Sequence, residues 1–227
     1  MTTFAEKVIA FNKELDYSGT LPAGIRIMNP FRKNSEILSI SRAFYEKFYN
    51  DHNRRKLILG INPGRLGAGA TGIPFTDSKR MSDKCGIQIE SVQTHEPSSV
   101  FVYEMIDKYG GAEKFYMDYF IGAVCPLGFV EKNQRGNWIN CNYYDHDDLF
   151  RAVRPFMVES LKKQIGFGVD TEICFVLGKK NARYLKLIND EEKLFGSLVV
   201  FDHPRFIIQY RSKSMNKYIS DYLTKLQ

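Results

Sequence analysis

The sequence predicts an α/β fold in which a central, mostly parallel sheet of four strands lies between two layers of helices, an α/β/α sandwich. Segments with helical periodicity alternate along the chain with short apolar runs that end at turn residues. Strands that are apolar along their whole length are typical of parallel sheets that helices cover on both faces. The chain shows no internal repeat, linker or low-complexity tract, so we expect a single domain over residues 1–227.

Four helices are predicted from apolar residues that recur every three to four positions. The second shows the pattern most clearly, because Ile37, Ile40, Phe44 and Phe48 fall on one helical face. The predicted helices are Phe4–Leu15, Glu36–Tyr49, Ser99–Lys108 and Asp148–Gln164.

Four strands are predicted from short apolar runs with β-branched residues, at Lys56–Ile61, Tyr119–Val124, Glu172–Leu177 and Leu198–Phe201. The longest stretches without periodicity are residues 62–77 and 126–142. Ordered loops of this length are usually functional.

The composition is that of a soluble globular protein, with 44% hydrophobic and 26% charged residues. No apolar run approaches the ~20 residues that a membrane-spanning helix needs. The N-terminal segment has acidic residues within its apolar stretch and lacks a small-residue cleavage site, so it resembles an amphipathic helix more than a signal peptide. We therefore expect a cytoplasmic protein without membrane contacts.

The cysteines and histidines, four of each, are scattered along the chain, and the sequence contains no C-x-x-C pair. The one metal-like cluster, residues 145–148, is better explained by acidic side chains in the first turn of a helix, where they interact favourably with its dipole. We expect reduced, buried thiols and no metal or redox cofactor.

The net charge of +6 is concentrated in two segments. Residues 52–80 carry +5 and residues 203–217 carry +4, so the remaining residues together carry −3. Local basic patches indicate phosphate contacts more strongly than a diffuse excess does, although solvated surface lysines would give a similar count.

Ligands of α/β sheets bind beyond the carboxyl ends of the strands. Asn62 follows the first predicted strand and His203 follows the fourth, which makes them candidate site residues. Each also has a purely structural explanation, as a turn-forming asparagine before Pro63 and as a hydrogen-bonded histidine.

Residues 67–72 satisfy the pattern G-x-G-x-x-G, which raises the alternative of a dinucleotide-dependent oxidoreductase. The match is poor, because the first glycine lies six residues past Ile61 and the motif runs into Pro74, which opposes a helix. These glycines are better explained by close approach of the backbone to a ligand or a DNA strand.

Residues 59–64 read L-G-I-N-P-G and residues 71–75 read T-G-I-P-F. Together they resemble the first catalytic motif of the uracil-DNA glycosylase superfamily, and in particular that of the SMUG type, the single-strand-selective monofunctional uracil-DNA glycosylases. Residues 119–129, YFIGAVCPLGF, are similar to that family's strand ending in C-P-L, and His203-Pro204 stands where the second motif begins. Residues 173–182 resemble the strand, glycine and helix before it.

The resemblance implies a hydrolase of base excision repair in a divergent, bacterial-looking branch, which would flip deaminated bases out of DNA and leave an abasic site. Such an enzyme would act as a monomer at the nucleoid, with DNA as its partner. Asn62 would orient the attacking water, His203 would donate a hydrogen bond to the departing base, and Phe75 would stack on it. The residues that it places at the base are Gly60, Ile61, Pro63, Gly64, Phe75, Ala123, Cys125 and Pro126. The residues that it places at the DNA are Arg65, Gly67, Gly69, Lys179, Arg205 and Arg211.

One departure from the family concerns Ala123, where the family usually has an asparagine that reads the pyrimidine edge. A methyl group forms no hydrogen bonds, so backbone groups, Asn140 or Asn142 are the candidates to replace it. We expect a less selective pocket that also accepts hypoxanthine or xanthine.

A second departure follows His203-Pro204, in the loop with which the family penetrates the duplex. Arg205 is a candidate wedge there, whereas residues 206–208 are compatible with either a wedge or the core. The alternative to an enzyme is a binding module or damage sensor that keeps the fold without the catalysis.

Overall fold

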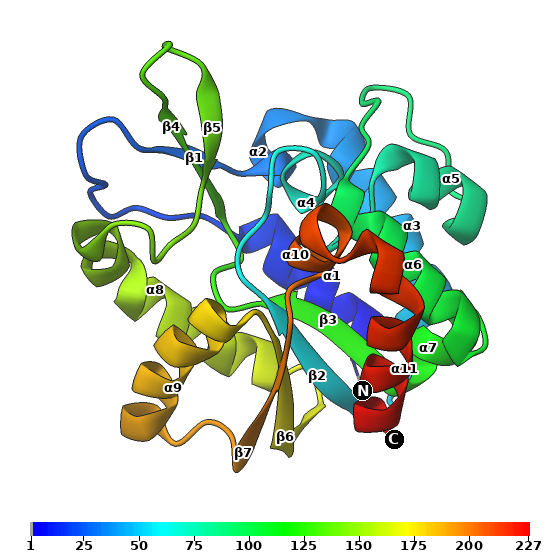
Figure 1. Cartoon of the computed structure of the whole chain (residues 1–227). Helices are drawn as coiled ribbons and strands as arrows, with labels where there is room; N and C mark the ends of the chain where they lie inside the picture. Colours follow the sequence, from blue (N-terminus) through cyan, green and yellow to red (C-terminus); the bar gives the residue numbers. More distant parts are fainter. Residues whose placement is uncertain (1) are drawn as a thin grey trace.

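A four-stranded sheet in the order β3-β2-β6-β7 forms the centre of the protein, whose computed structural model describes residues 2–227 (Figure 1). All three strand pairings are parallel, and Leu57 lies opposite both Phe120 and Cys174. The four strands are those predicted, although β6 begins earlier than the sequence suggested. Their bounds are Arg55–Gly60 for β2, Tyr119–Ala123 for β3, Val169–Leu177 for β6 and Ser197–Phe201 for β7.

Helices cover both faces of this sheet. Phe120 points to one face, where its ring lies 5.2 Å from that of Phe4 in α1 (Phe4–Glu14). Phe201 belongs to the opposite face, where its ring stacks 4.1 Å from that of Tyr222 in α11 (Met215–Leu226). Tyr222 in turn contacts Phe101 of α6 (Pro97–Tyr109). The predicted α/β/α sandwich is therefore confirmed.

The four predicted helices end within two residues of their expected limits, because local signals define their ends. Thr3 forms a capping box with Glu6 at the start of α1, and Asn34 caps α3 (Ser35–Tyr49). Asp147 and Asp148 lie in the first turn of α8 (Asp147–Ile165), as expected. The other helices are α2 (Pro30–Lys33), α4 (Ala68–Thr71), α5 (Ser78–Cys85), α7 (Ala112–Asp118), α9 (Lys179–Glu192) and α10 (Pro204–Tyr210), with a 3-10 turn at Ser212–Ser214.

A second, antiparallel sheet in the order β1-β4-β5 was not predicted from the sequence. It contains β1 (Arg26–Met28), β4 (Gly128–Lys132) and β5 (Trp138–Cys141), and it projects from one end of the molecule (Figure 1). Its hairpin occupies most of the long non-periodic stretch after Pro126. The strands are short and partly exposed, and a turn in which Asn133 accepts from the N–H groups of Arg135 and Asn137 joins β4 to β5. Mixed polar and apolar residues of this kind give no clear strand period.

None of the helices within residues 2–227 combines the length and the apolar character that crossing a membrane would require.

Candidate active site

A cavity of about 610 Å³ opens where β2, β3 and β7 end, and its volume lies within the range of about 300–1,000 Å³ that is usual for ligand pockets. It receives residues from the loop after β2, the start of α6, the β5 strand and the start of α10. The residues predicted from the sequence that line it are Gly60, Ile61, Asn62, Pro63, Gly64, Arg65, Phe75, Ala123, His203 and Arg205.

Asn62 is oriented by the last residue of β5 and by the segment that follows it. Its Nδ2 donates to the carbonyl of Cys141 at 3.3 Å, while its Oδ1 accepts from the backbone N–H of Tyr143 at 3.1 Å. These opposite bonds define which end of the amide is the oxygen. Since an amide oxygen has two lone pairs, one stays available for a water molecule in the cavity.

His203 is held by α10, the helix that it caps. Its Nδ1 accepts from the backbone N–H of Arg205 at 3.1 Å, which leaves Nε2 as the protonated nitrogen of the neutral ring. Burial, with a smaller effect of the Arg205 charge, lowers the pKa of His203 to about 4. The imidazole is therefore a neutral hydrogen-bond donor at physiological pH.

Phe75 has a left-handed backbone with a φ of 51°, which is rare for an aromatic residue. Its ring lies against Gly60, where an added Cβ would come within 3.2 Å of it, and its centroid is 5.9 Å from that of His203. Strained conformations of this kind gather at functional sites. The geometry thus favours a ring that forms one wall of the pocket over simple core packing.

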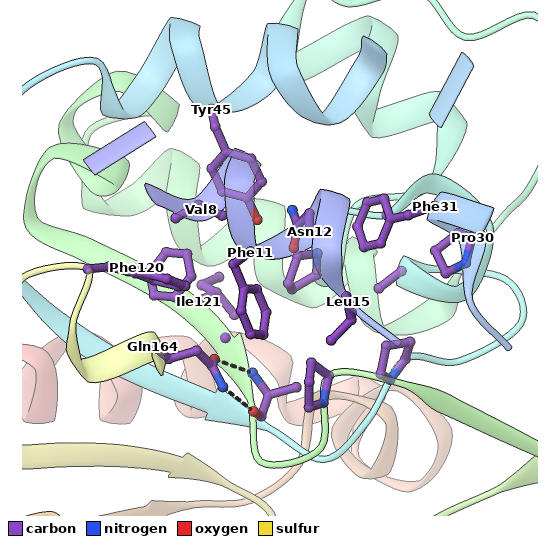
Figure 2. Close-up of a pocket in the computed structure, with 18 residues that line it drawn as sticks. Val8, Phe11, Asn12, Leu15, Pro30, Phe31, Tyr45, Phe120, Ile121 and Gln164 are labelled. Atoms are coloured by element: carbon purple, nitrogen blue, oxygen red, sulfur yellow. Dashed lines mark hydrogen bonds between the residues drawn. The ribbon is translucent and has the colours of Figure 1, made fainter. Parts of the chain in front are cut away.

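The backbone groups of Ala123 are already occupied. Gln164, at the end of α8, donates from Nε2 to the Ala123 carbonyl at 3.0 Å and accepts from its N–H at 3.3 Å. Figure 2 shows these two bonds beside a small apolar cavity of about 50 Å³ behind the strand. The one backbone donor of Ala123 is therefore already used within the protein and does not replace the family's asparagine as a donor.

Asn140 and Asn142 both line the cavity, but their amides differ. The Nδ2 of Asn142 donates to Asp145 at 2.9 Å. The Oδ1 of Asn140 instead accepts from the backbone N–H of Arg65 at 3.0 Å, so its Nδ2 is the free end and lies against Gly64. Asn140 therefore offers the cavity an amide donor in a defined orientation.

Two of the predicted substrate-binding residues do not line the cavity. Cys125 is fully buried, and its N–H donates to the carbonyl of Ile61 at 3.1 Å, so it supports the loop after β2 from behind. Pro126 lines the small apolar cavity instead. Both belong to the C-P-L segment, which the sequence could not distinguish from the pocket wall.

Close packing within the protein requires a glycine at both position 67 and position 69. A Cβ at Gly69 would lie 2.7 Å from the carbonyl oxygen of Gly64, and one at Gly67 would lie 2.4 Å from the carboxyl group of Glu96. Gly69 lies in α4, a helix of four residues that Gly72 caps. This helix is too short for the dinucleotide fingerprint, and the oxidoreductase alternative loses its structural basis.

The basic segment 52–80 does not form one surface, contrary to the expectation from its charge. Arg55 is buried in an ion pair with Asp51, and Arg54 pairs with Asp170, both at the end of β2 opposite the cavity. Arg65 is the basic residue of this segment that lines the cavity.

The second basic segment has its charges closer to the site, since it begins at His203. Arg205 lines the cavity, and Arg211 follows α10 with its guanidinium 5.5 Å from the ring centroid of Phe206. Ile207 is buried in the core, whereas Phe206 is 38% exposed, so the two residues have different roles. Lys179 forms an exposed ion pair with Asp202, directly before His203.

The arrangement of Glu131, Cys141 and His146 brings three potential ligand atoms within 4.8 Å of one another. Burial raises the pKa of the Cys141 thiol to about 12, and His146 already bonds Glu131 at 2.7 Å. The Cys141 thiol is also directed toward the carbonyl oxygen of Asn142, at 3.6 Å. These contacts account for the cluster as hydrogen bonds between the hairpin and His146, the residue that caps α8.

Comparisons with known proteins identify the family of the chain. The profile described as the uracil DNA glycosylase superfamily matches residues 46–227. The crystal structure of wild-type SMUG2 from Pedobacter heparinus is 50% identical in sequence, covering 99% of this chain and 97% of its own, with a TM-score of 0.96. No curated protein sequence matches the chain.

The chain belongs to the uracil-DNA glycosylase superfamily, a class of enzymes that act on DNA. Within that class, its similarity to SMUG2 confirms the resemblance to the SMUG type.

Proposed function

We propose that this protein is a monofunctional DNA glycosylase that flips deaminated bases out of DNA and hydrolyses their N-glycosidic bonds. The observation that carries the proposal is the presence of Asn62, Phe75 and His203 around one cavity, each in a defined orientation. A lysine nucleophile would make the enzyme bifunctional, and none of the described residues that line the cavity is a lysine.

In the proposed reaction the bond between C1′ and the base nitrogen breaks, and the oxygen of a water molecule bonds to C1′. The electron pair leaves with the base. The water proton passes to solvent, because a neutral amide is not a base near pH 7. Asn62 would contribute by positioning the water and by directing its amide oxygen toward the positive charge that develops on the sugar.

His203 would stabilise the departing base. Its neutral Nε2–H is a donor for the base carbonyl oxygen, where negative charge accumulates as the bond breaks. Phe75 would stack on the flipped base and hold it between the two polar groups.

Asn140 is the residue that we propose as the reader of the base edge. Deamination converts an amino group into a carbonyl in each case, from cytosine to uracil, adenine to hypoxanthine and guanine to xanthine. A fixed amide N–H donates to a carbonyl oxygen, whereas an amino group is itself a donor and offers it no acceptor. Donor-based reading therefore supports a range that extends from uracil to deaminated purines.

Replacing Asn140 with alanine is expected to lower kcat/KM for uracil excision by about 2–10-fold, the value of one neutral hydrogen bond. The matched control is Asn142→Ala, because the Asn142 amide is already bonded to Asp145. Single-turnover and steady-state excision from a uracil-containing oligonucleotide would measure both variants. A larger loss in the Asn142 variant than in the Asn140 variant would contradict the assignment.

The function itself is tested by incubating the protein with oligonucleotides that contain uracil, hypoxanthine or xanthine and then treating them with alkali. Strand breaks at the modified position are expected. Binding without alkali-labile sites on any of the three would instead indicate a non-catalytic binding module, and breaks confined to uracil would reject the broader range.

DNA binding is expected to depend on salt, since phosphate contacts release counterions. Arg65→Ala should reduce the slope of log K against log salt concentration by about 1. Arg54→Ala is the matched control, because Arg54 lies at the far end of β2 and pairs with Asp170. Fluorescence anisotropy across a salt series would measure the slopes, and equal slopes for the two variants would remove Arg65 from the DNA contact surface.

A further inference from the structure

Glu96 is a carboxyl group in the wall of the cavity that the proposed reaction does not use. It lies directly before α6 and lines the same cavity as His203 and Arg205. Nothing in the sequence distinguishes it from a surface glutamate. Its environment becomes visible only when the loop after β2 is folded against α6.

The carboxyl group of Glu96 is packed but not paired. It lies so close to the backbone of Gly67 that a Cβ there would come within 2.4 Å of it. Its Oε2 is shielded from solvent and has no hydrogen-bond partner. A buried, unpartnered carboxylate oxygen is costly, so the site favours the neutral acid or requires a ligand.

The charged groups around Glu96 do not neutralise it. Asp77 accepts from the Glu96 backbone N–H at 2.8 Å and from Arg80 at 3.1 Å, so the charge of Arg80 is directed to Asp77. His95 is exposed and also lies near Asp77, at 3.6 Å, while Arg205 is exposed at the start of α10. Burial, followed by the negative charge of Asp77, raises the pKa of Glu96 to about 7, and the charge of Arg205 opposes this shift.

The chemistry of DNA decides what such a group can do. The sugar–phosphate backbone is negatively charged and offers hydrogen-bond acceptors. An ionised carboxylate is therefore repelled by it and has no hydrogen to donate to it. A protonated carboxyl group carries no charge and donates one hydrogen bond. The negative potential of a bound strand also favours the protonated form.

We propose that Glu96 is a DNA-contacting residue that is protonated in the complex, where its carboxyl group donates a hydrogen bond to a backbone oxygen of the strand carrying the flipped nucleotide. DNA binding then takes up one proton at this position. The inference rests on the proposed function only in taking DNA as the ligand.

The test measures binding separately from catalysis. The full-length protein is titrated at constant ionic strength, from pH 6 to 9, into a labelled single-stranded oligonucleotide with a tetrahydrofuran abasic analogue, which cannot be excised. Wild-type affinity should fall as the pH rises above 7, approaching tenfold per pH unit. Glu96→Gln keeps a neutral donor of the same shape, so its affinity should vary little with pH and exceed that of the wild type at pH 9.

Calorimetry in buffers of different ionisation enthalpy supplies a second readout, the number of protons taken up when DNA binds. The wild type should take up protons near pH 8, and Glu96→Gln should not. Glu104→Gln, an exposed acid on the same helix, is the matched control and should behave as the wild type. Thermal unfolding would verify that each variant is folded.

Two results would overturn the proposal. Weaker binding by Glu96→Gln at every pH, with wild-type affinity that rises with pH, would show an ionised carboxylate that accepts from a base N–H. An unchanged pH dependence in Glu96→Gln would show that Glu96 does not contact the strand. Uracil excision should be measured with the same preparations. Excision that persists together with either of these two results would reject the role of Glu96 alone, whereas absence of excision would reject the proposed function.

Discussion

Asn62→Ala is expected to lower the single-turnover rate of uracil excision by about 10²–10³-fold and to leave DNA affinity nearly unchanged. The reason is that the amide oxygen would act on the water and on the charge that develops at C1′, neither of which contributes to binding in the ground state. A rate loss without an affinity loss is the signature of an interaction made only in the transition state.

The Asn62 variant needs a structural control, since the side chain also bonds Cys141 and Tyr143. Thermal unfolding would report the loss of those bonds, for which about 1–3 kcal/mol is expected if a buried group is left unpaired. Asn216→Ala, at an exposed position on α11, should keep the full rate. Full excision activity in the Asn62 variant would exclude Asn62 from the mechanism.

His203→Ala is expected to reduce the rate by about 10²–10³-fold, the usual effect of removing one donor from a developing oxyanion. The loss should be smaller for bases that are better leaving groups, because these need less stabilisation. His203→Asn separates catalysis from structure, since asparagine is a good helix cap and can still accept from the Arg205 N–H. This variant should remain folded while losing most of the rate.

The pH profile gives an independent measure of His203. Because its pKa is lowered to about 4, the ring stays neutral above pH 5, and its titration should produce no break in the excision rate between pH 5 and 8. In the unfolded chain the ring takes up a proton near its ordinary pKa of 6.5. The folded protein should therefore lose stability as the pH falls from 6.5 toward 4. A rate that increases on protonation near pH 6.5 would indicate a charged imidazole instead.

The parts of the protein that the sequence predicted are those with local signals. The alternation of 3.6-residue and strand-like patterns identified β2, β3, β6 and β7 and the helices α1, α3, α6 and α8. Short motifs placed Asn62 and His203 at strand ends and Phe75 at the end of the first motif. The β4–β5 hairpin escaped prediction because its short, partly exposed strands contain both polar and apolar residues. The prediction that residues 52–80 form one basic surface was wrong for Arg54 and Arg55. These residues lie at the start of β2, and the cavity lies at the other end of that strand.

The sequence by itself determined the fold class and the strand-end positions of Asn62 and His203, since side-chain periodicity and strand-end motifs depend on neighbours within a few residues. Only the tertiary structure decided which polar groups are free. Gln164 is hydrogen-bonded to the backbone of Ala123, 41 positions away in the sequence. The backbone N–H of Arg65 donates to the side-chain amide of Asn140, 75 positions away, and so fixes its orientation. The carboxyl group of Glu96 packs against the backbone of Gly67, which belongs to a different loop. Hydrogen-bond partners and burial are set by the packing of distant segments, so no local pattern records them.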